Sequence, residues 1–344
     1  MKIARPMAAI SMALAAFVVS AANPEVGLAQ GAAPVPMVLI SQANEAGFPL
    51  WLARKLNYFA DNGIDARIQY FPNGGAALAS GASGDWQGGW IGSPPAITGW
   101  AKFGLIPVGT MMKEDRNIKL IMRKDALKGS SPKEVLMSKP IGSVPNSTWS
   151  QVLFACAKHF GANPDKMKVV PLAPPVTRQS LRSGEVASGT TDSSPDYDLV
   201  MDKANFEVVC DGAVAKSSVI DPYVVTTRFA KEHPDAAAKF IEAAFRANEL
   251  IMSDREKAVK YLLEFYKDVG IDGDETKARY TLDYRDYQTL DQALADMKSG
   301  ASEKALTETA QVFVAGGAYD KVPDLKAAIK SGLPIVEAAR KLRK

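Results

Sequence analysis

Short strand-like runs alternate with helical runs along most of this sequence, and this alternation restricts its fold more than any other feature. Residues 36–41 (PMVLIS) are typical of a buried strand, residues 50–62 of an amphipathic helix that ends at Gly63, and residues 64–71 of an alternating strand. Glycine is favoured just after a helix because it adopts the left-handed conformation at little steric cost. A strand-helix-strand order predicts a mostly parallel sheet with helices on both faces.

The same pattern occurs twice before the chain becomes almost entirely helical. Further strands are expected at residues 86–91, 107–111, 119–123, 140–144, 167–172, 186–190, 206–210 and 219–226, with helices at 96–103, 149–160 and 176–183. Later helices are expected at 234–251, 254–266, 274–282, 289–297 and 303–315, followed by two short C-terminal pieces. We therefore predict an α/β protein with two lobes, each a mostly parallel sheet flanked by helices.

The predicted lobes are interleaved in the sequence. Lobe 1 is expected to contain residues 30–124 and 222–344, and lobe 2 residues 125–221. The chain would cross between the lobes at two hinges, at residues 123–125 and 220–222.

The first thirty residues have the character of an export signal. Lys2 and Arg5 precede an uncharged apolar run at residues 7–22, and small residues follow it. This order predicts a signal peptide over residues 1–29 and a mature protein that lies in the periplasm without membrane insertion. The alternative is a membrane anchor, but the run is shorter than the roughly 20 residues that span a bilayer. No cysteine lies near it to carry a lipid.

Composition and motifs favour binding over catalysis. The chain has 344 residues with 41 Lys and Arg, 38 Asp and Glu, and only two His and two Cys. The net charge of +3 is spread evenly and predicts no nucleic-acid partner. Motifs for zinc, phosphate loops and hydrolytic triads are absent, so no metal, cofactor or enzymatic activity is expected. Cys156 and Cys210 would form either one disulfide or two buried thiols.

Polar turns follow five of the predicted strands. In doubly wound sheets, ligands bind outside the carboxyl ends of the strands, so we expect these turns to converge on one cleft between the lobes. The candidate ligand-binding residues in the turns and at the second hinge are Gln42, Asn44, Phe48, Gly74, Gly75, Ser93, Pro94, Ser147, Thr148, Trp149, Thr191, Asp192 and Asp221.

The turn at residues 145–151 carries the clearest local signal. Thr148 and Gln151 fit a capping box, so Ser147 or Thr148 would cap a helix. The free N–H groups and positive dipole end of such a helix attract an anion without any Lys or Arg. Trp149 would stack on the ligand, or else pack in the core of an ordinary capped helix. The other tryptophans are expected in the core of lobe 1: Trp51, Trp86, Trp90 and Trp100.

Taken in order, several segments resemble solute-binding proteins of ABC importers for nitrate, sulfonates and taurine, a family that also includes binders of thiamine precursors. The resemblance is carried by residues 49–54 (PLWLAR), 74–75 (GG), 91–96 (IGSPPA), 141–145 (IGSVP) and 182–186 (RSGEV). It implies a two-lobe type II periplasmic-binding-protein fold. It also implies a monomer that delivers a small organic anion, most simply a sulfonate or taurine, to an inner-membrane ABC permease.

The resemblance also implies roles for two of the turns. The Ser147-Thr148 turn would hold the anionic group of the ligand, and the Ser93-Pro94 turn would face it across the cleft. The chain departs from the family after Val186, and there Asp192 would either contact a cationic group, such as a taurine-like amine, or cap the next turn.

Binding by both lobes would favour a closed state that the permease recognises. Two other functions remain open at this point. Some relatives of this fold are enzymes that make pyrimidine or menaquinone precursors, although the shortage of His disfavours such chemistry here. Alternatively, the chain would serve as the solute receptor of a sensor kinase or chemotaxis protein.

Overall fold

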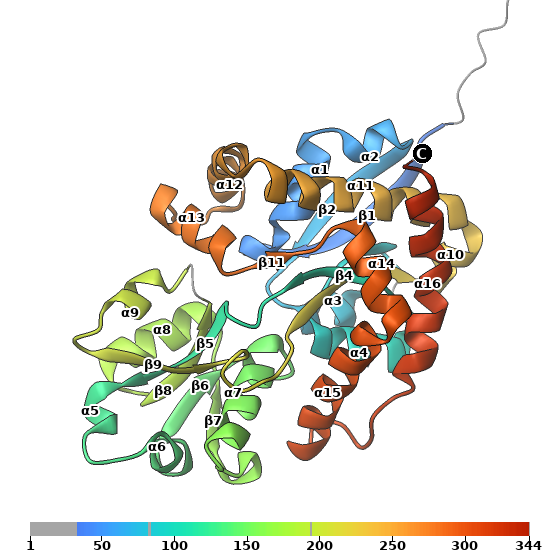
Figure 1. Ribbon diagram of the computed structural model, residues 1–344. Coiled ribbons are helices and arrows are strands. Elements are labelled where there is room, and N and C mark those ends of the chain that lie inside the picture. Colours follow the sequence, from blue (N-terminus) through green and yellow to red (C-terminus); the bar gives the residue numbers. More distant parts are fainter. Residues whose placement is uncertain (1–32, 82–83, 193–194, 344) are drawn as a thin grey trace, which may run out of the picture. The chain divides into compact units, whose positions relative to one another are not determined.

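The computed structural model of the chain describes residues 33–81, 84–192 and 195–343, and the expected signal peptide at residues 1–29 lies outside them. These residues form two β-sheets, one of six strands and one of five, with helices packed around each (Figure 1). None of the helices in the described ranges combines the length and the apolar character that a membrane crossing requires.

The first sheet has the strand order β11-β4-β10-β3-β1-β2. Its strands are β1 (Val35–Gln42), β2 (Ile64–Phe71), β3 (Gly88–Trp90), β4 (Leu105–Lys113), β10 (Ile220–Thr226) and β11 (Asp286–Tyr287). β1 is parallel to β2 and β3, whereas β10 runs antiparallel to both β3 and β4. Because β10 lies between β3 and β4, the late part of the chain is built into the centre of this sheet.

Gly89 allows β3 to approach β1 closely. Its φ angle is 141°, and a Cβ atom at this position would lie 2.1 Å from the carbonyl oxygen of Ile40. Only glycine tolerates both conditions, since a side chain would clash with the neighbouring backbone. This fit positions Trp90, the next residue, at the end of the strand.

The second sheet has the strand order β7-β6-β8-β5-β9. Its strands are β5 (Ile118–Arg123), β6 (Pro140–Ser143), β7 (Lys168–Pro171), β8 (Ser188–Asp192) and β9 (Phe206–Asp211). β6 is parallel to β7 and β8, and β5 runs antiparallel to β8 and β9. Each sheet therefore has a parallel group of three strands and one antiparallel strand next to it.

The chain changes sheets twice, at residues 114–117 and 212–219 (Figure 1). The first change comes earlier than the hinge predicted at residues 123–125. β5 pairs with β8 and β9, so residues 118–123 belong with the second sheet and not with lobe 1. The apolar alternation of residues 118–123 predicts a strand but does not specify which strands it pairs with. For this reason the sequence-based prediction assigned the strand to lobe 1.

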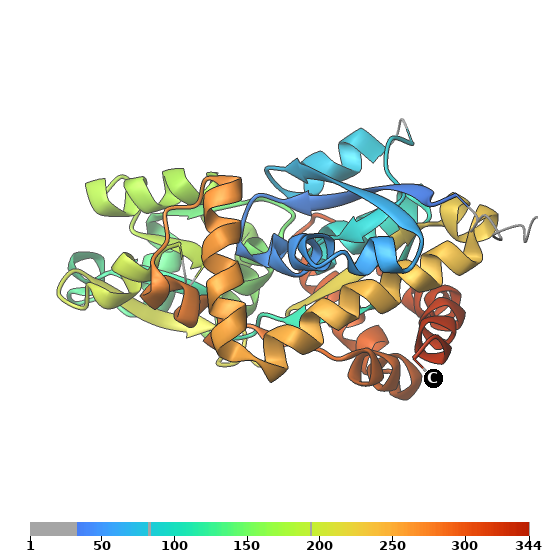
Figure 2. The same ribbon diagram turned by 90° about the horizontal axis from the view of Figure 1, so that it is seen from above.

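Helices pack on both sheets. Those before β10 are α1 (Phe48–Lys55), α2 (Tyr58–Asp61), α3 (Gly74–Gly81), α4 (Ser93–Phe103), α5 (Lys124–Leu127), α6 (Pro132–Ser138), α7 (Thr148–His159), α8 (Pro174–Ser183) and α9 (Tyr197–Met201). Those after it are α10 (Thr227–Glu232), α11 (Pro234–Ser253), α12 (Arg255–Val269), α13 (Glu275–Asp283), α14 (Leu290–Ser299), α15 (Ala301–Ala315) and α16 (Leu325–Lys341). Figure 2 shows α11, in yellow, running alongside the blue α1 and α2, against which it packs.

Two predicted helices differ from the structure. The helix expected at residues 50–62 is divided into α1 and α2, because Asn57 takes a left-handed conformation with φ at 59°. The two short C-terminal pieces are one continuous helix, α16, which contains Pro334. Proline removes one backbone hydrogen bond but does not end a helix that is held by packing on both sides. α16 packs on β4, α11 and α14.

Cys156 and Cys210 form a disulfide, which decides between the two alternatives left open by the sequence. The bond joins α7 to β9, and both residues are buried in the core of the second sheet. It therefore fixes the helix that begins at Ser147 and Thr148 to the strand that precedes the second change of sheets.

Removing this disulfide is expected to lower the free energy of unfolding by about 2–4 kcal/mol, because the cross-link restricts the unfolded chain. The two cysteines are 54 residues apart, for which the chain-entropy model predicts about 4 kcal/mol. Denaturant unfolding of Cys156→Ser/Cys210→Ser measures the effect. Adding reductant to the wild type should reproduce the loss and leave the variant unchanged. Equal midpoints for the variant and the oxidised wild type would contradict this expectation.

Candidate functional site

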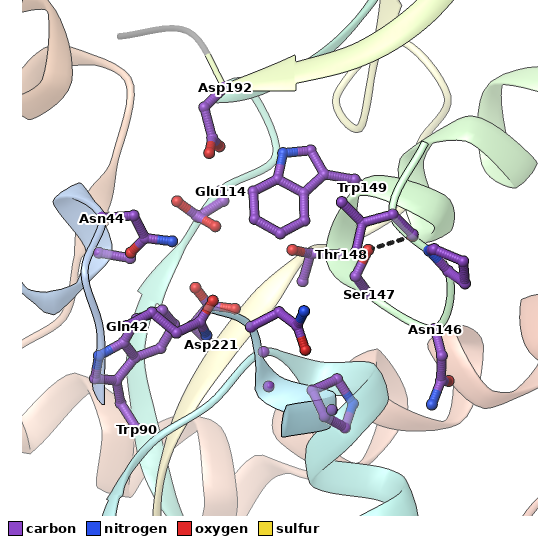
Figure 3. Close-up of a pocket in the computed structure, with 18 of the residues that line it drawn as sticks. Gln42, Asn44, Trp90, Glu114, Asn146, Ser147, Thr148, Trp149, Asp192 and Asp221 are labelled. Atoms are coloured by element: carbon purple, nitrogen blue, oxygen red, sulfur yellow. Dashed lines mark hydrogen bonds between the residues drawn. The ribbon is translucent and has the colours of Figure 1, made fainter. Parts of the chain in front are cut away.

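A cavity of about 30 Å³ lies between the two sheets (Figure 3). The residues that line it come from strand ends and helix starts: Gln42, Asn44, Ala46, Asn73, Gly74, Gly75, Trp90, Gly92, Pro95, Glu114, Val144, Pro145, Asn146, Ser147, Thr148, Trp149, Asp192, Asp221 and Arg285. Most of them follow β1, β2, β3, β4, β6 or β8, so the strand ends of both sheets converge here as the sequence predicted.

Most of the candidate residues line this cavity. They are Gln42, Asn44, Gly74, Gly75, Ser147, Thr148, Trp149, Asp192 and Asp221. Their contact with a ligand remains a prediction, but the structure brings them together from separate turns and strand ends.

The other four candidates lie behind the cavity wall. Phe48 is fully buried and packs on Trp51 and Phe265, because it belongs to the core beneath α1. The Ser93 side chain turns away and donates to Gln151 Oε1 at 3.2 Å. Pro94 and Thr191 are likewise not among the lining residues, which instead include Gly92, Pro95 and Asp192. Thr191 is excluded because successive strand residues face opposite sides of the sheet.

Three helices of eight or more residues begin at the cavity. α3 starts at Gly74, α4 at Ser93 after Gly92, and α7 at Thr148 after Ser147. The first N–H groups of a helix have no intrahelical partner, and its dipole is positive at this end. Three such termini around one small volume make it a favourable place for an anionic group.

Ser147 caps α7, and the capping box differs from the one predicted. The Ser150 N–H donates to Ser147 Oγ at 3.4 Å, while the Ser147 N–H donates to Ser150 Oγ at 3.0 Å. Thr148 is already the first helical residue, so it cannot form the box with Gln151 that the sequence indicated. The short serine side chains provide the reciprocal pair in place of the usual glutamate or glutamine.

Gln151 connects α7, the helix that packs on the second sheet, to three segments that belong with the first sheet. Its Nε2 donates to Ser218 O and to Thr309 Oγ1, both at 2.9 Å. Its Oε1 accepts from Ser93 Oγ at 3.2 Å. The side chain is fully buried and so links α7 to α4, to α15 and to the returning segment before β10.

Three carboxyl groups and one guanidinium group also face the cavity. Glu114, Asp192, Asp221 and Arg285 are each no more than 5% exposed. Arg285 Nε donates to Glu114 Oε1 at 2.9 Å, and Asn117 Nδ2 donates to the same oxygen at 2.9 Å and to Asp192 Oδ1 at 3.0 Å. In Figure 3 the carboxyl groups of Glu114 and Asp192 point toward each other beside the indole of Trp149.

Burial and mutual repulsion affect the protonation of this cluster. Burial raises the pKa of Asp192 well above its ordinary value, and the charge of Glu114 raises it further. Burial also raises the pKa of Asp221, as do the charge of Glu114 and a hydrogen bond with it. Arg285 acts in the opposite direction on both groups but is a single charge. The cluster therefore retains protons at pH values where exposed aspartates have lost them.

Tryptophans take part in both the core and the cavity wall. Trp90 was expected only in the core, but it also lines the cavity, and its Nε1 donates to Ser41 Oγ at 2.9 Å. Trp149 combines its two alternative roles, since it packs in the core of the second sheet and forms part of the wall. Within the part of the chain that the structure describes, Trp149 Nε1 has no hydrogen-bond partner.

Ten lining residues were not among the candidates, and those with polar, charged or aromatic side chains are Asn73, Trp90, Glu114, Asn146 and Arg285. Glu114 had the same signal as the five polar turns, because it opens a polar segment directly after β4. Arg285 had no comparable signal, since it lies between a helix and a two-residue strand far along the chain. Among the described residues, no group of three or more His, Cys, Asp or Glu side chains is arranged to hold a metal ion.

The fold matches solved structures of periplasmic binding proteins. The nitrate-binding protein of Synechocystis PCC 6803 has a TM-score of 0.71 at 10% identity, with 90% of this chain and 89% of that one covered. The alkanesulfonate-binding protein of Xanthomonas axonopodis pv. citri has a TM-score of 0.62 at 17% identity, covering 83% of this chain and 98% of that one. The predicted α/β class with a periplasmic-binding-protein fold is confirmed, and each sheet combines a parallel group with antiparallel pairings.

Sequence comparison then gives the family. The NMT1/THI5-like family model matches residues 44–258, more than half of the chain, and the chain belongs to this family. The taurine-binding periplasmic protein of Escherichia coli (strain K12) is 26% identical over 286 residues, which cover 80% of this chain and 84% of that protein. The predicted relationship to solute-binding proteins is thereby confirmed.

Proposed function

We propose that this chain is the exported, periplasmic solute-binding component of an ABC importer. It captures a small organic anion, most simply a sulfonate or a taurine-like molecule, between its two sheets and delivers it to an inner-membrane permease. The observation that carries the proposal is the convergence of the α3, α4 and α7 N-termini on one cavity between the sheets. The names of its relatives support a binding protein over an enzyme.

Binding in this proposal requires the two lobes to open and close. A cavity of about 30 Å³ holds little more than one water molecule, so a sulfonate enters only when the sheets move apart. Residues 114–117 and 212–219 connect the sheets and serve as the hinges. Ligand contacts from both lobes then stabilise the closed arrangement, which the permease recognises. The protein acts as a monomer, because each copy contains both walls of the site.

The anion site is tested by Ser147→Ala/Thr148→Ala, which removes two hydroxyl groups at the start of α7. We expect the affinity for the best-bound sulfonate to fall by about 10–100-fold, since two ligand or capping hydrogen bonds are lost. Isothermal titration with taurine, ethanesulfonate and nitrate measures this. The matched control is Ser131→Ala. It removes the capping box of α6, a helix that lies beside the second sheet like α7 but does not line the cavity.

The control should lose about 1 kcal/mol of stability but none of its affinity, because Ser131 caps its helix without lining the site. Wild-type affinity in the double variant would contradict an anion site at α7.

A further inference from the structure

The acidic groups of the cavity are not explained by anion binding. Among the lining residues that the structure describes, the ionisable side chains are Glu114, Asp192, Asp221 and Arg285. If all four were ionised, three negative charges and one positive charge would leave a net charge of −2, and burial together with this repulsion raises the pKa of Asp192 and Asp221. A simple anion beside these groups would oppose their ionisation further, whereas a cation would favour it.

The single guanidinium does not satisfy the three carboxyl groups. Arg285 Nε donates to Glu114 Oε1, and Asn117 supplies the contact to Asp192 Oδ1. Asp221, only 1% exposed, has an Oδ1 atom that accepts no hydrogen bond from any residue in the ranges 33–81, 84–192 and 195–343. A buried carboxylate oxygen without a donor costs free energy, so this atom is suited to accept from a ligand.

The remaining groups around this end of the cavity also suit a positive charge. Asn44 Oδ1 is a second buried acceptor with no partner in the described part of the chain. The rings of Trp90 and Trp149 form part of the wall, and aromatic faces attract cations. Figure 3 places the Trp149 ring next to the carboxyl groups of Glu114 and Asp192.

We propose that the solute carries a cationic ammonium group, which binds among Glu114, Asp192 and Asp221 while its anionic group meets the helix N-termini. The ligand class is therefore a small zwitterion rather than a simple anion. This inference deepens the proposed function and rests on it. An ammonium group supplies three N–H donors on one centre, which matches several carboxylate oxygens and an amide oxygen around one point.

The site also couples binding to protons. Before binding, the carboxyl groups of Asp192 and Asp221 hold protons because of burial and of their neighbour Glu114; Glu45 and Asp196 add to this effect at Asp192, and Arg285 opposes it. An ammonium ion stabilises the charged carboxylates and displaces those protons. Affinity for the zwitterion should therefore rise with pH until the groups are ionised without ligand.

The test compares probes that differ in one group. Taurine carries a sulfonate and an ammonium, 2-hydroxyethanesulfonate replaces the ammonium with a hydroxyl of similar size, ethanesulfonate lacks it, and ethylamine lacks the sulfonate. Titration calorimetry should show taurine binding about 100-fold or more tightly than either sulfonate without the ammonium, since a buried charge pair is lost. Proton release, measured in buffers of different ionisation enthalpy, should accompany taurine alone among the three sulfonates.

Asp192→Asn keeps the shape of the side chain and removes its charge. It should reduce the preference for taurine over 2-hydroxyethanesulfonate by about 10-fold or more. Asp198→Asn is the matched control, because Asp198 is exposed on α9 and does not line the cavity. The control should keep the wild-type preference.

The outcomes separate this inference from the proposed function. If the three sulfonates bind equally, the anion receptor stands and the ammonium site is wrong. If ethylamine binds and none of the sulfonates does, the ammonium site stands and the anion receptor is wrong. If none of the four probes binds, both are wrong for solutes of this size.

Discussion

Replacing Arg285 with Met is expected to lower the free energy of unfolding at about pH 8 by about 3–5 kcal/mol, because it leaves a buried carboxylate without its counter-charge. Arg285 and Glu114 have side chains only 1% and 5% exposed, and 2.9 Å separates Nε from Oε1. Asp192 and Asp221 are also affected, because Arg285 lowers the pKa of each of them. The loss of stability should therefore be at least as large as the one expected from removing the disulfide.

The pH dependence of this loss follows from its cause. Without Arg285, the folded-state pKa values of Asp192 and Asp221 rise further above their unfolded values, so ionising these two groups costs the folded protein more free energy. A group with a raised folded pKa contributes stability below its unfolded pKa and loses it as the pH rises through the folded pKa. The deficit of Arg285→Met should therefore be small near about pH 5 and complete near about pH 8.

Denaturant unfolding at both pH values measures this effect. The matched control is Arg255→Met, which removes an exposed ion pair with Asp283 in the same part of the chain. It should cost at most about 1 kcal/mol at either pH, because water screens exposed pairs. The double variant Arg285→Met/Glu114→Gln should recover part of the loss. A stability of Arg285→Met within about 1 kcal/mol of wild type at about pH 8 would show that the carboxyl groups do not need this guanidinium.

The second large effect is expected for Gln151→Met, which preserves side-chain length but removes three buried hydrogen bonds. Ser218 O and Ser93 Oγ lose their partner, and Thr309 Oγ1 loses a donor while it keeps its own bond to Ala305 O. We expect the free energy of unfolding to fall by about 2–4 kcal/mol, because each unsatisfied buried group costs about 1 kcal/mol or more. Ligand affinity should fall by about 10-fold or more. The reason is that these bonds join α7 to α4 and α15 and so stabilise the closed arrangement of the two lobes.

Gln311→Met provides the control for this substitution. Gln311 lies on α15 like Thr309, but its side chain is exposed, so both stability and affinity should stay near wild type. Chemical denaturation and titration with the best-bound probe measure the two quantities. Loss of stability with unchanged affinity would show that Gln151 supports the fold but has no part in closing the site.

The local elements of the fold were predictable from a few residues at a time. Residues 64–71 alternate in polarity and form β2 with these bounds, and the segment after residue 227 is helical as its pattern indicated, apart from the two-residue strand β11. The serine at residue 147 was recognised as a possible cap, although the choice between partners at Gln151 and Ser150 required the structure. Such signals are readable because strand alternation, helical spacing and capping depend on neighbours within about four residues.

The polar turns were predictable as candidates but not as a complete site. Gly74 and Thr148 follow strands, Asp192 is the last residue of one, and all three line the cavity, since strand ends share one edge of a sheet. Phe48 occurs in a similar turn but points into the core. Which way a side chain faces at the end of a strand depends on the packing around it, and the sequence contains no local mark of this.

The sequence by itself determined the order of strands and helices, the family, and the scarcity of groups suited to catalysis. Only the tertiary structure decided that β5 joins the second sheet, that Cys156 meets Cys210, and that Arg285 reaches Glu114 from 171 residues away. The physical reason is that periodicity and capping depend on residues a few positions apart. Strand partners and buried charge pairs instead depend on contacts between residues far apart in the sequence, which form only when the whole chain folds.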